Sequence, residues 1–189
     1  VITGNERLKL RFNPSTFILN NRKWAISQDG EVILKNNKQF VIDNLSLKQG
    51  EQEINVFTMP SSETNSNDIH IDTKKINMGD ILPYVLKSPR IEGIATGKFV
   101  ISDAMGKSNI SINSLQVNEF RLDGDSIGVM NLKGHFIAAT GKGTFNVESP
   151  NKRYNFDGLI ELDLHDSTGN QINAPMNFNH TRIDILNNY

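Results

Sequence analysis

The chain of 189 residues contains no cysteine. This absence excludes disulfides, thiolate catalysis and every zinc site built on cysteine, and the four histidines form no close pair in the sequence. An excess of charge of one sign is also missing, because 20 basic residues stand against 21 acidic ones and leave a net charge of −1. Such a balance provides no field that would recruit nucleic acid or an anionic membrane surface. We therefore expect no nucleic-acid partner, no metal and no other cofactor.

Long hydrophobic runs are absent as well. No stretch approaches the roughly 18 to 20 apolar residues that cross a bilayer as a helix. The first residues, Val1 to Gly4, show neither a start methionine nor a signal-peptide pattern. We therefore expect a segment of a longer protein, with any membrane anchor outside it. A hydrophobic fraction of 37% and an aromatic fraction of 7% are too high for a disordered chain and low for a globule, which predicts a thin core.

Apolar and polar residues alternate along almost the whole chain, as they do in strands with one apolar face. Clear examples are Ile54/Val56, Phe99/Ile101, Phe145/Val147 and Ile160/Leu162/Leu164. Turn-forming residues separate such stretches at intervals of roughly 8 to 12 residues, as Asp123-Gly124-Asp125 does. We therefore predict an all-β fold of many short antiparallel strands.

Two further features concern the organisation of the chain. One short helix is predicted near residues 80–86, with Asp80 as its N-cap and Pro83 in its first turn. The polar run between Met59 and Asp68 has no periodicity and marks the internal boundary that we predict. This gives an N-terminal β unit over residues 1–60, a polar loop or spacer over 61–68 and a C-terminal β unit over 69–189, with one continuous sheet as the alternative.

Two short motifs look like ligand-binding loops but lack the rest of the pattern. Asp123-Gly124-Asp125 is not followed by the closing glutamate of an EF-hand, so a hairpin turn is predicted there. Gly141-Lys142-Gly143-Thr144 lacks the earlier glycine of a P-loop, because residue 136 is Phe. No serine lies in a nucleophile elbow, and Glu161 and Asp163 are expected on the wet face of a strand. We therefore predict no catalytic residue and no enzyme activity.

The apolar stripe is the informative feature, because many consecutive strands with one apolar face must cover that face. A closed barrel, a sandwich and a groove filled by a ligand are the three solutions.

Trp24–Gly30 and then Asn44–Ile54 follow the rhythm "W-x-I…G…I…L-x-L…G-x-Q-x-I". This rhythm resembles that of the TamB/AsmA-like (translocation and assembly module) family. Ile76–Tyr84, followed by Ile91–Gly97, is similar to the family's short helix before a "G-x-x-x-G" strand, and Val117–Gly134 fits with its Asp-Gly turn. The resemblance covers residues 22 to 165.

This resemblance implies an elongated curled sheet, or β-taco, with an apolar interior. It also implies a parent protein that is tethered in the inner membrane and crosses the periplasm to a BamA-type outer-membrane barrel. Such proteins are associated with outer-membrane protein assembly and with moving phospholipids between membranes. On this basis we expect the chain to be a structural, lipid-conducting segment without catalytic activity. The inward-pointing residues that would line its lipid groove are Phe99, Ile101, Phe145, Val147, Ile160 and Leu162.

A compact β-sandwich that binds glycan or protein, as part of a secreted or surface protein, is the alternative. In that case the stripe is an ordinary core between two sheets.

Overall fold

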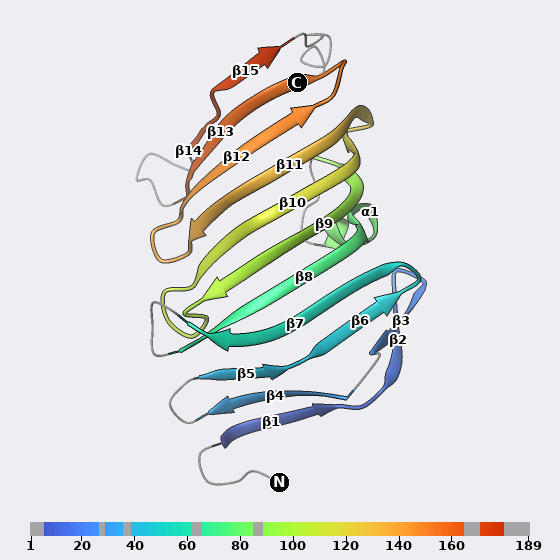
Figure 1. Cartoon of the computed structure of the whole chain (residues 1–189), viewed down its shortest axis with the longest axis vertical. Helices are drawn as coiled ribbons and strands as arrows, with labels where there is room; N and C mark the ends of the chain where they lie inside the picture. The colour runs from blue at the N-terminus through green and yellow to red at the C-terminus, as the bar shows by residue number, and fades with distance from the viewer. Residues whose placement is uncertain are drawn as a thin grey trace.

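The structure, a computed structural model, describes residues 6–26, 29–35, 39–61, 66–84, 89–164 and 171–179. It confirms the predicted all-β fold, in which antiparallel strands form a curled sheet accompanied by one short helix (Figure 1). The strands of the described ranges are β1 (Glu6–Phe12), β2 (Ser15–Leu19), β3 (Arg22–Ile26), β4 (Gly30–Lys35), β5 (Phe40–Asp43), β6 (Leu45–Gln49), β7 (Gln52–Pro60), β8 (Asn67–Asn77), β9 (Ile91–Ser102), β10 (Asn109–Leu122), β11 (Asp125–Ile137), β12 (Lys142–Pro150), β13 (Asn155–Asp163), β14 (Gln171–Asn173) and β15 (Met176–Asn179).

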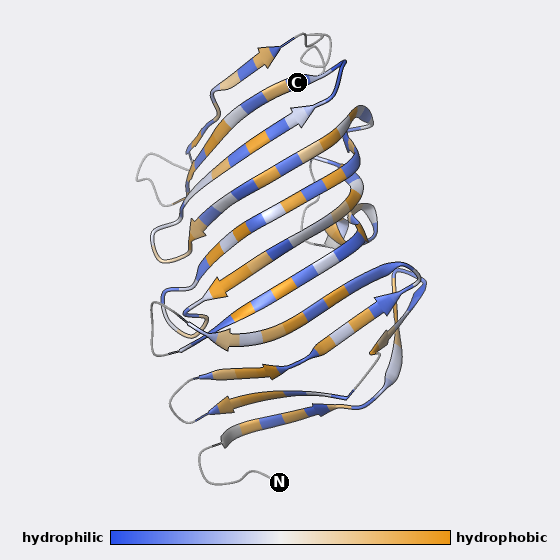
Figure 2. Ribbon diagram, viewed as in Figure 1, coloured by the Kyte–Doolittle hydropathy of each residue, from blue (hydrophilic) through white to orange (hydrophobic). Residues whose placement is uncertain are grey.

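A single 12-stranded antiparallel sheet contains most of these strands. Its order is β14-β13-β12-β11-β10-β9-β8-β7-β6-β3-β2, with β15 also paired to β13, and it does not close into a barrel. In Figure 2 hydrophobic and hydrophilic residues alternate along the strands β7 to β13. This period of two gives the sheet one apolar face.

The other three strands form a small sheet, β1-β4-β5, that lies next to β7 (Figure 1). Side chains link the two sheets at this point. The Thr58 hydroxyl accepts from the Ile42 N–H at 3.1 Å and donates to the Ile42 carbonyl at 3.4 Å, and the Asn67 amide donates to the Phe40 carbonyl at 2.8 Å. Side chains of β7 and β8 therefore satisfy backbone groups of β5 where the two sheets meet.

Strand pairing is continuous across the boundary predicted at residues 61–68. β7 ends at Pro60 and β8 begins at Asn67, and these two residues are themselves a pair in the antiparallel ladder that β7 and β8 share. Residues 62–65 lie outside the described part of the chain.

Four adjacent strands bend along one line across the sheet. A residue with positive φ lies in each of them: Lys75 in β8 (52°), Gly93 in β9 (143°), Glu119 in β10 (54°) and Gly128 in β11 (106°). The ladder shifts register at the same places. Such bulges increase local twist and bend a strand, and in Figure 1 the ends of these strands curl on the side where α1 lies.

These bulges also explain why some strands are longer than the short strands predicted from the sequence. Ile110/Ile112, Leu115/Val117 and Phe120/Leu122 look like separate short strands in the sequence, because the alternation changes phase between them. The structure places all of them in β10, a single strand of 14 residues. The phase changes are bulges within this strand.

The helix is present but begins earlier than predicted. α1 spans Met78–Ile81 and continues as a 3-10 turn over Leu82–Tyr84. Its N-cap is Asn77, whose side chain accepts from the Gly79 N–H at 3.1 Å, so the prediction of Asp80 as the cap is wrong. Both residue types are good caps, and the sequence alone did not separate them. Val85 and Leu86, which the prediction included, lie outside the described residues.

A cluster of buried apolar side chains lies at the curled end of the sheet. Trp24 from β3 meets Ile76, Ala95 and Val117 from β8, β9 and β10. Partly buried side chains surround them, namely Leu19, Leu47, Ile54, Met78, Ile81, Leu115, Phe120 and Met130. This cluster is the thin core that the composition predicts, and it leaves much of the apolar face outside it.

Candidate functional site: the apolar face

The candidate site is the part of the sheet surface away from this core. Antiparallel partners project to the same side, so the register of the ladders defines rows of side chains that share a face. Three neighbouring rows begin on β8 and cross the sheet, the first as far as β13, the second as far as β14 and the third as far as β15. We call these rows together the apolar face. The first row is Ile71, Phe99, Ile112, Gly134, Phe145 and Ile160; the second is Ile69, Ile101, Ile110, Phe136, Gly143, Leu162 and Ile172; the third is Thr73, Gly97, Leu115, Leu132, Val147, Gly158 and Met176.

The structure places all six predicted groove residues on this one face. Phe99, Phe145 and Ile160 lie in the first row, Ile101 and Leu162 in the second, and Val147 in the third. Phe145 and Ile160 are direct ladder partners, whereas Phe99 is separated from Phe145 by β10 and β11. Val147 is buried and the other five are half-buried. The six therefore belong to one continuous surface and do not form a closed pocket of their own.

No charged side chain occurs in the three rows. They contain no Asp, Glu, Lys or Arg, and Thr73 is the one polar member. The hydroxyl of Thr73 donates to the Gly97 carbonyl at 3.1 Å, so its hydrogen bond stays within the sheet. Several apolar side chains at the margins remain exposed, including Ile172 (69%) and, beside the rows on β15, Phe178 (54%). An uncharged surface of this extent is rare on the outside of a water-soluble domain unless it binds something apolar.

Charges are collected on the opposite face. Ion pairs bridge neighbouring strands there, from Lys48 to Glu53 at 3.2 Å and from Lys142 to Asp163 at 3.1 Å. A depression of about 470 Å³ also lies over β11, β12, β13 and β15. Polar residues of this face line it, among them Asn131, Lys133, Asn146, Glu148, Asp157 and Asn177. The sheet is therefore amphipathic, with one face suited to water and the other to hydrocarbon.

Glycines shape the apolar face around Phe145. Gly134 and Gly143 lie next to the ring, and a Cβ added at either one would approach ring carbons of Phe145 to 2.6 Å and 2.9 Å. A Cβ at Gly143 would also lie 3.0 Å from Phe136. The missing side chains thus leave the space that the two aromatic rings occupy. The sequence pattern identified Phe145 but gave no sign of this arrangement, because a glycine within a strand has several explanations.

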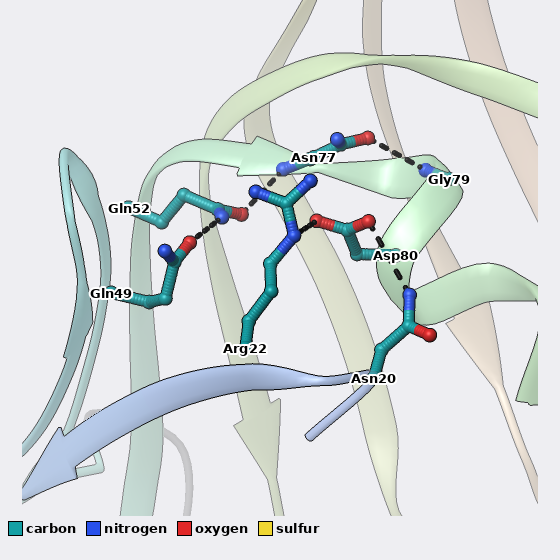
Figure 3. Close-up of polar contacts among 7 residues, drawn as sticks. All are labelled: Asn20, Arg22, Gln49, Gln52, Asn77, Gly79 and Asp80. Carbon is teal, nitrogen blue, oxygen red and sulfur yellow. Dashed lines mark hydrogen bonds and ion pairs between the residues drawn. The ribbon is translucent and has the colours of Figure 1, made fainter. Parts of the chain in front are cut away.

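A polar cluster lies where the β2–β3 hairpin meets α1 (Figure 3). The Arg22 Nε lies 2.9 Å from Asp80 Oδ2, and the Asn20 amide donates to Asp80 Oδ1 at 3.4 Å. Next to it, the Gln52 side chain accepts from the Asn77 N–H at 2.7 Å and donates to Gln49. The sequence did not predict this cluster, since its residues come from five separate elements, β3, β6, β7, β8 and α1, and from the turn between β2 and β3.

The structure also bears on metal sites and on membrane-spanning helices. Within the described residues, no group of three or more His, Asp or Glu side chains is arranged to hold a metal ion. His70 stacks on Phe57 with ring centroids 5.3 Å apart, on the face opposite the apolar one. Across the same residues, no helix is both long and apolar enough to cross a membrane.

Comparison with known proteins adds no relative. The chain matches no protein-family model, no curated protein and no solved structure.

Proposed function

We propose that the apolar face binds the acyl chains of lipids and shields them from water. The observation that carries this proposal is the absence of any charged residue from the three rows, together with the partial exposure of most of their side chains. A hydrocarbon chain makes no hydrogen bonds, so it needs a surface of this kind and no polar partner. Each methylene that is removed from water contributes about 0.8 kcal/mol.

The dimensions of the rows suit such a ligand. The second row crosses seven strands, from Ile69 in β8 to Ile172 in β14. At about 4.8 Å between strands it is about 29 Å long, while one leaflet of a bilayer has a hydrocarbon thickness of about 15 Å. An acyl chain can therefore lie along a row with its whole length on apolar side chains.

The proposal extends to the setting of the protein. The fold and the resemblance to the TamB/AsmA-like family together support a structural, lipid-conducting segment of a periplasm-spanning protein that serves outer-membrane biogenesis. In that setting the parent is anchored in the inner membrane, phospholipid is the cargo, and a BamA-type barrel is the protein partner. No catalytic residue is required, because shielding hydrocarbon is a matter of surface and not of chemistry.

A second candidate function is recognition of a polar ligand, such as a glycan, by the opposite face. The observation in its favour is the 470 Å³ depression, whose amides and carboxylates could bond to hydroxyl groups. Asn177 already donates to Asp157 there at 3.0 Å, which fixes part of this lining.

A matched pair of charge insertions separates the two candidates. Phe145→Lys places an ammonium on the apolar face, and Asn146→Lys places the same group on the other face, one residue along β12. Titration with a fluorescent fatty acid is expected to show about tenfold weaker binding for Phe145→Lys and unchanged binding for Asn146→Lys. Circular dichroism is the control that checks whether both variants fold. Equal affinity of the two variants contradicts the proposal.

A further inference from the structure

The hairpin formed by β2 and β3 covers one end of the uncharged surface. Trp24 is 3% exposed and packs on Ile76, Ala95 and Val117. Ile76 and Val117 are both ladder partners of Ala95, and Ala95 lies on the same side of β9 as Gly97 and Phe99. The surface beneath Trp24 is therefore the same face of the same sheet as the three rows. Without the hairpin, the apolar face would extend to the curled end.

The hairpin is attached to the sheet by few bonds. β3 pairs with β6 through two residue pairs, Ala25↔Lys48 and Ile26↔Leu47. The other strand, β2, is an edge strand within the described sheet, and its Ile18 is 76% exposed. Each of the other pairs of neighbouring strands from β6 to β13 is joined by more residue pairs than the two that join β3 to β6. The hairpin is thus a unit that can separate from the sheet at lower cost than the strands beneath it.

An ion pair holds the tip of the hairpin to α1. Arg22 begins β3 and lies 2.9 Å from Asp80, and Asn20 bonds to the other oxygen of the same carboxylate (Figure 3). The Asp80 side chain is 15% exposed and that of Arg22 is 45% exposed. A cleft of about 650 Å³ adjoins Arg22, so water can reach the guanidinium and compete for it. Partly exposed ion pairs of this kind are weak enough to break and re-form.

We propose that the β2–β3 hairpin is a removable cover over an extension of the acyl-binding face, with Arg22–Asp80 as its latch. This inference rests on the proposed function. When the latch opens, Trp24 leaves the surface of Ile76, Ala95 and Val117, and an acyl chain takes its place. An acyl chain that binds there replaces one apolar group by another, so bound lipid covers again the surface that Trp24 leaves. The latch therefore regulates how much of the face is available to lipid.

Tryptophan fluorescence tests the cover directly, because Trp24 is the one tryptophan of the chain. Asp80→Asn removes the charge from the latch. Asp72→Asn makes the same change in an outer-face pair of β8, whose carboxylate lies 3.7 Å from Lys98. Without lipid, Asp80→Asn is expected to shift the Trp24 emission to the red and to raise its quenching by acrylamide. Asp72→Asn is expected to match the wild type.

Photo-methionine then maps where an acyl chain lies. The chain has five methionines, of which Met176 lies in the third row and Met130 borders the covered surface, while Met59 and Met105 lie off the apolar face. With oleic acid as the probe, the wild type is expected to form adducts at Met176. The Asp80→Asn variant is expected to add Met130 and to bind the acid about twofold to fivefold more tightly. Met59 and Met105 serve as internal controls.

A reversible lock provides a second variant, which holds the hairpin on the sheet independently of the latch. Ala25→Cys with Lys48→Cys joins a ladder pair between β3 and β6 in a chain that has no other thiol. In the Asp80→Asn background, oxidation is expected to return Met130 labelling and Trp24 quenching to the wild-type level, and reduction is expected to release them.

The outcomes separate this inference from the proposed function. Adducts at Met176 with unchanged Trp24 emission in Asp80→Asn overturn the cover and leave the acyl-binding face standing. A red shift in Asp80→Asn that the oxidised lock abolishes, with no oleate adduct at any apolar-face methionine, supports a mobile hairpin and contradicts lipid binding.

Discussion

The side chain of Asn151 makes two hydrogen bonds to the backbone of Val129, in the way that a neighbouring strand does with its own backbone groups. Its Nδ2 donates to the Val129 carbonyl at 2.8 Å, and its Oδ1 accepts from the Val129 N–H at 3.0 Å. The same Nδ2 also donates to the hydroxyl of Ser149, which is 0% exposed and itself donates to the Tyr154 carbonyl at 2.6 Å. The turn after β12 is thereby fastened to β11 beyond the point where their ladder ends.

Replacing Asn151 is expected to loosen this end of the sheet. Asn151→Ala leaves the N–H and carbonyl of Val129 without their partner, which costs about 1–3 kcal/mol of the free energy of unfolding. Asn146→Ala, on an exposed side chain of β12, serves as the control and is expected to change stability by less than about 0.5 kcal/mol. Urea denaturation followed by circular dichroism measures both, and equal midpoints contradict the role assigned to Asn151.

Glu119 provides a test of how the sheet bends. Its φ of 54° lies in the left-handed region, which costs a residue with a Cβ roughly 1–2 kcal/mol. Glu119→Gly removes this cost, but glycine also gives the unfolded chain more conformational freedom, which offsets part of the gain. The free energy of unfolding is therefore expected to rise by up to about 1 kcal/mol. Glu119→Val is expected to lower it by at least about 1 kcal/mol, because β-branched residues rarely adopt this conformation. Chemical denaturation of the two variants decides the matter; a valine variant as stable as the glycine variant would speak against a bulge at this position.

Gly134 tests the packing of the apolar face. A Cβ here would contact the Thr144 carbonyl oxygen and would lie 2.6 Å from Phe145 Cδ1, so the backbone or the ring must move. Gly134→Ala is expected to destabilise the protein by about 1–3 kcal/mol, the cost of overpacking. In the helix, the Cβ of Gly79→Ala would lie 3.3 Å from its nearest atom, the Asn77 Oδ1, so this variant is expected to lose less stability than Gly134→Ala. Thermal unfolding of both variants compares them, and similar losses would refute the close packing around Phe145.

Acid is expected to weaken the attachment of β1. Hydrogen bonds from Arg11 and then from Lys9 hold the pKa of Glu31 below its ordinary 4.5. The ionised carboxylate therefore stabilises the β1–β4 pairing above pH 4.5, and this contribution is lost as the pH falls through the lower pKa of the folded state. Hydrogen exchange of the β1 amides, corrected for intrinsic rates, is expected to accelerate at pH 3 relative to pH 6. In Glu31→Gln the acceleration is expected to be smaller, and an identical response in the two proteins contradicts the prediction.

The alternation of the sequence was sufficient to place the six candidate residues on one face. In a strand every second side chain shares a side, and an antiparallel ladder carries that side from Phe99 in β9 to Phe145 in β12. The bend could not be read in the same way. Lys75 and Glu119 adopt positive φ although neither residue type favours it, so the residue types at these positions do not identify the bulges. The change of phase that they cause made β10 look like several strands.

The covered end of the face also depends on relationships that the sequence does not reveal. Trp24 and Val117 meet across elements that are far apart in the chain, and a hairpin that lies over a sheet has the same alternation as one that extends it. The helix cap is a second example, because the sequence does not reveal whether Asn77 or Asp80 is used. Which of two suitable caps is used depends on the path of the preceding strand, and β8 ends at Asn77.

The measurement that tests the central claim most directly is photo-crosslinking with a lipid that carries a diazirine in its acyl chain. The wild-type chain is mixed with phosphatidylcholine vesicles that contain this lipid, irradiated, digested and mapped by mass spectrometry. Adducts are expected on the apolar face, at residues such as Phe99, Phe145 and Leu162, and not at neighbours such as Lys98, Asn146 and Glu161 on the other side of the same strands. Adducts on the charged face, or none at all with the chain folded, would contradict the claim that this surface shields acyl chains.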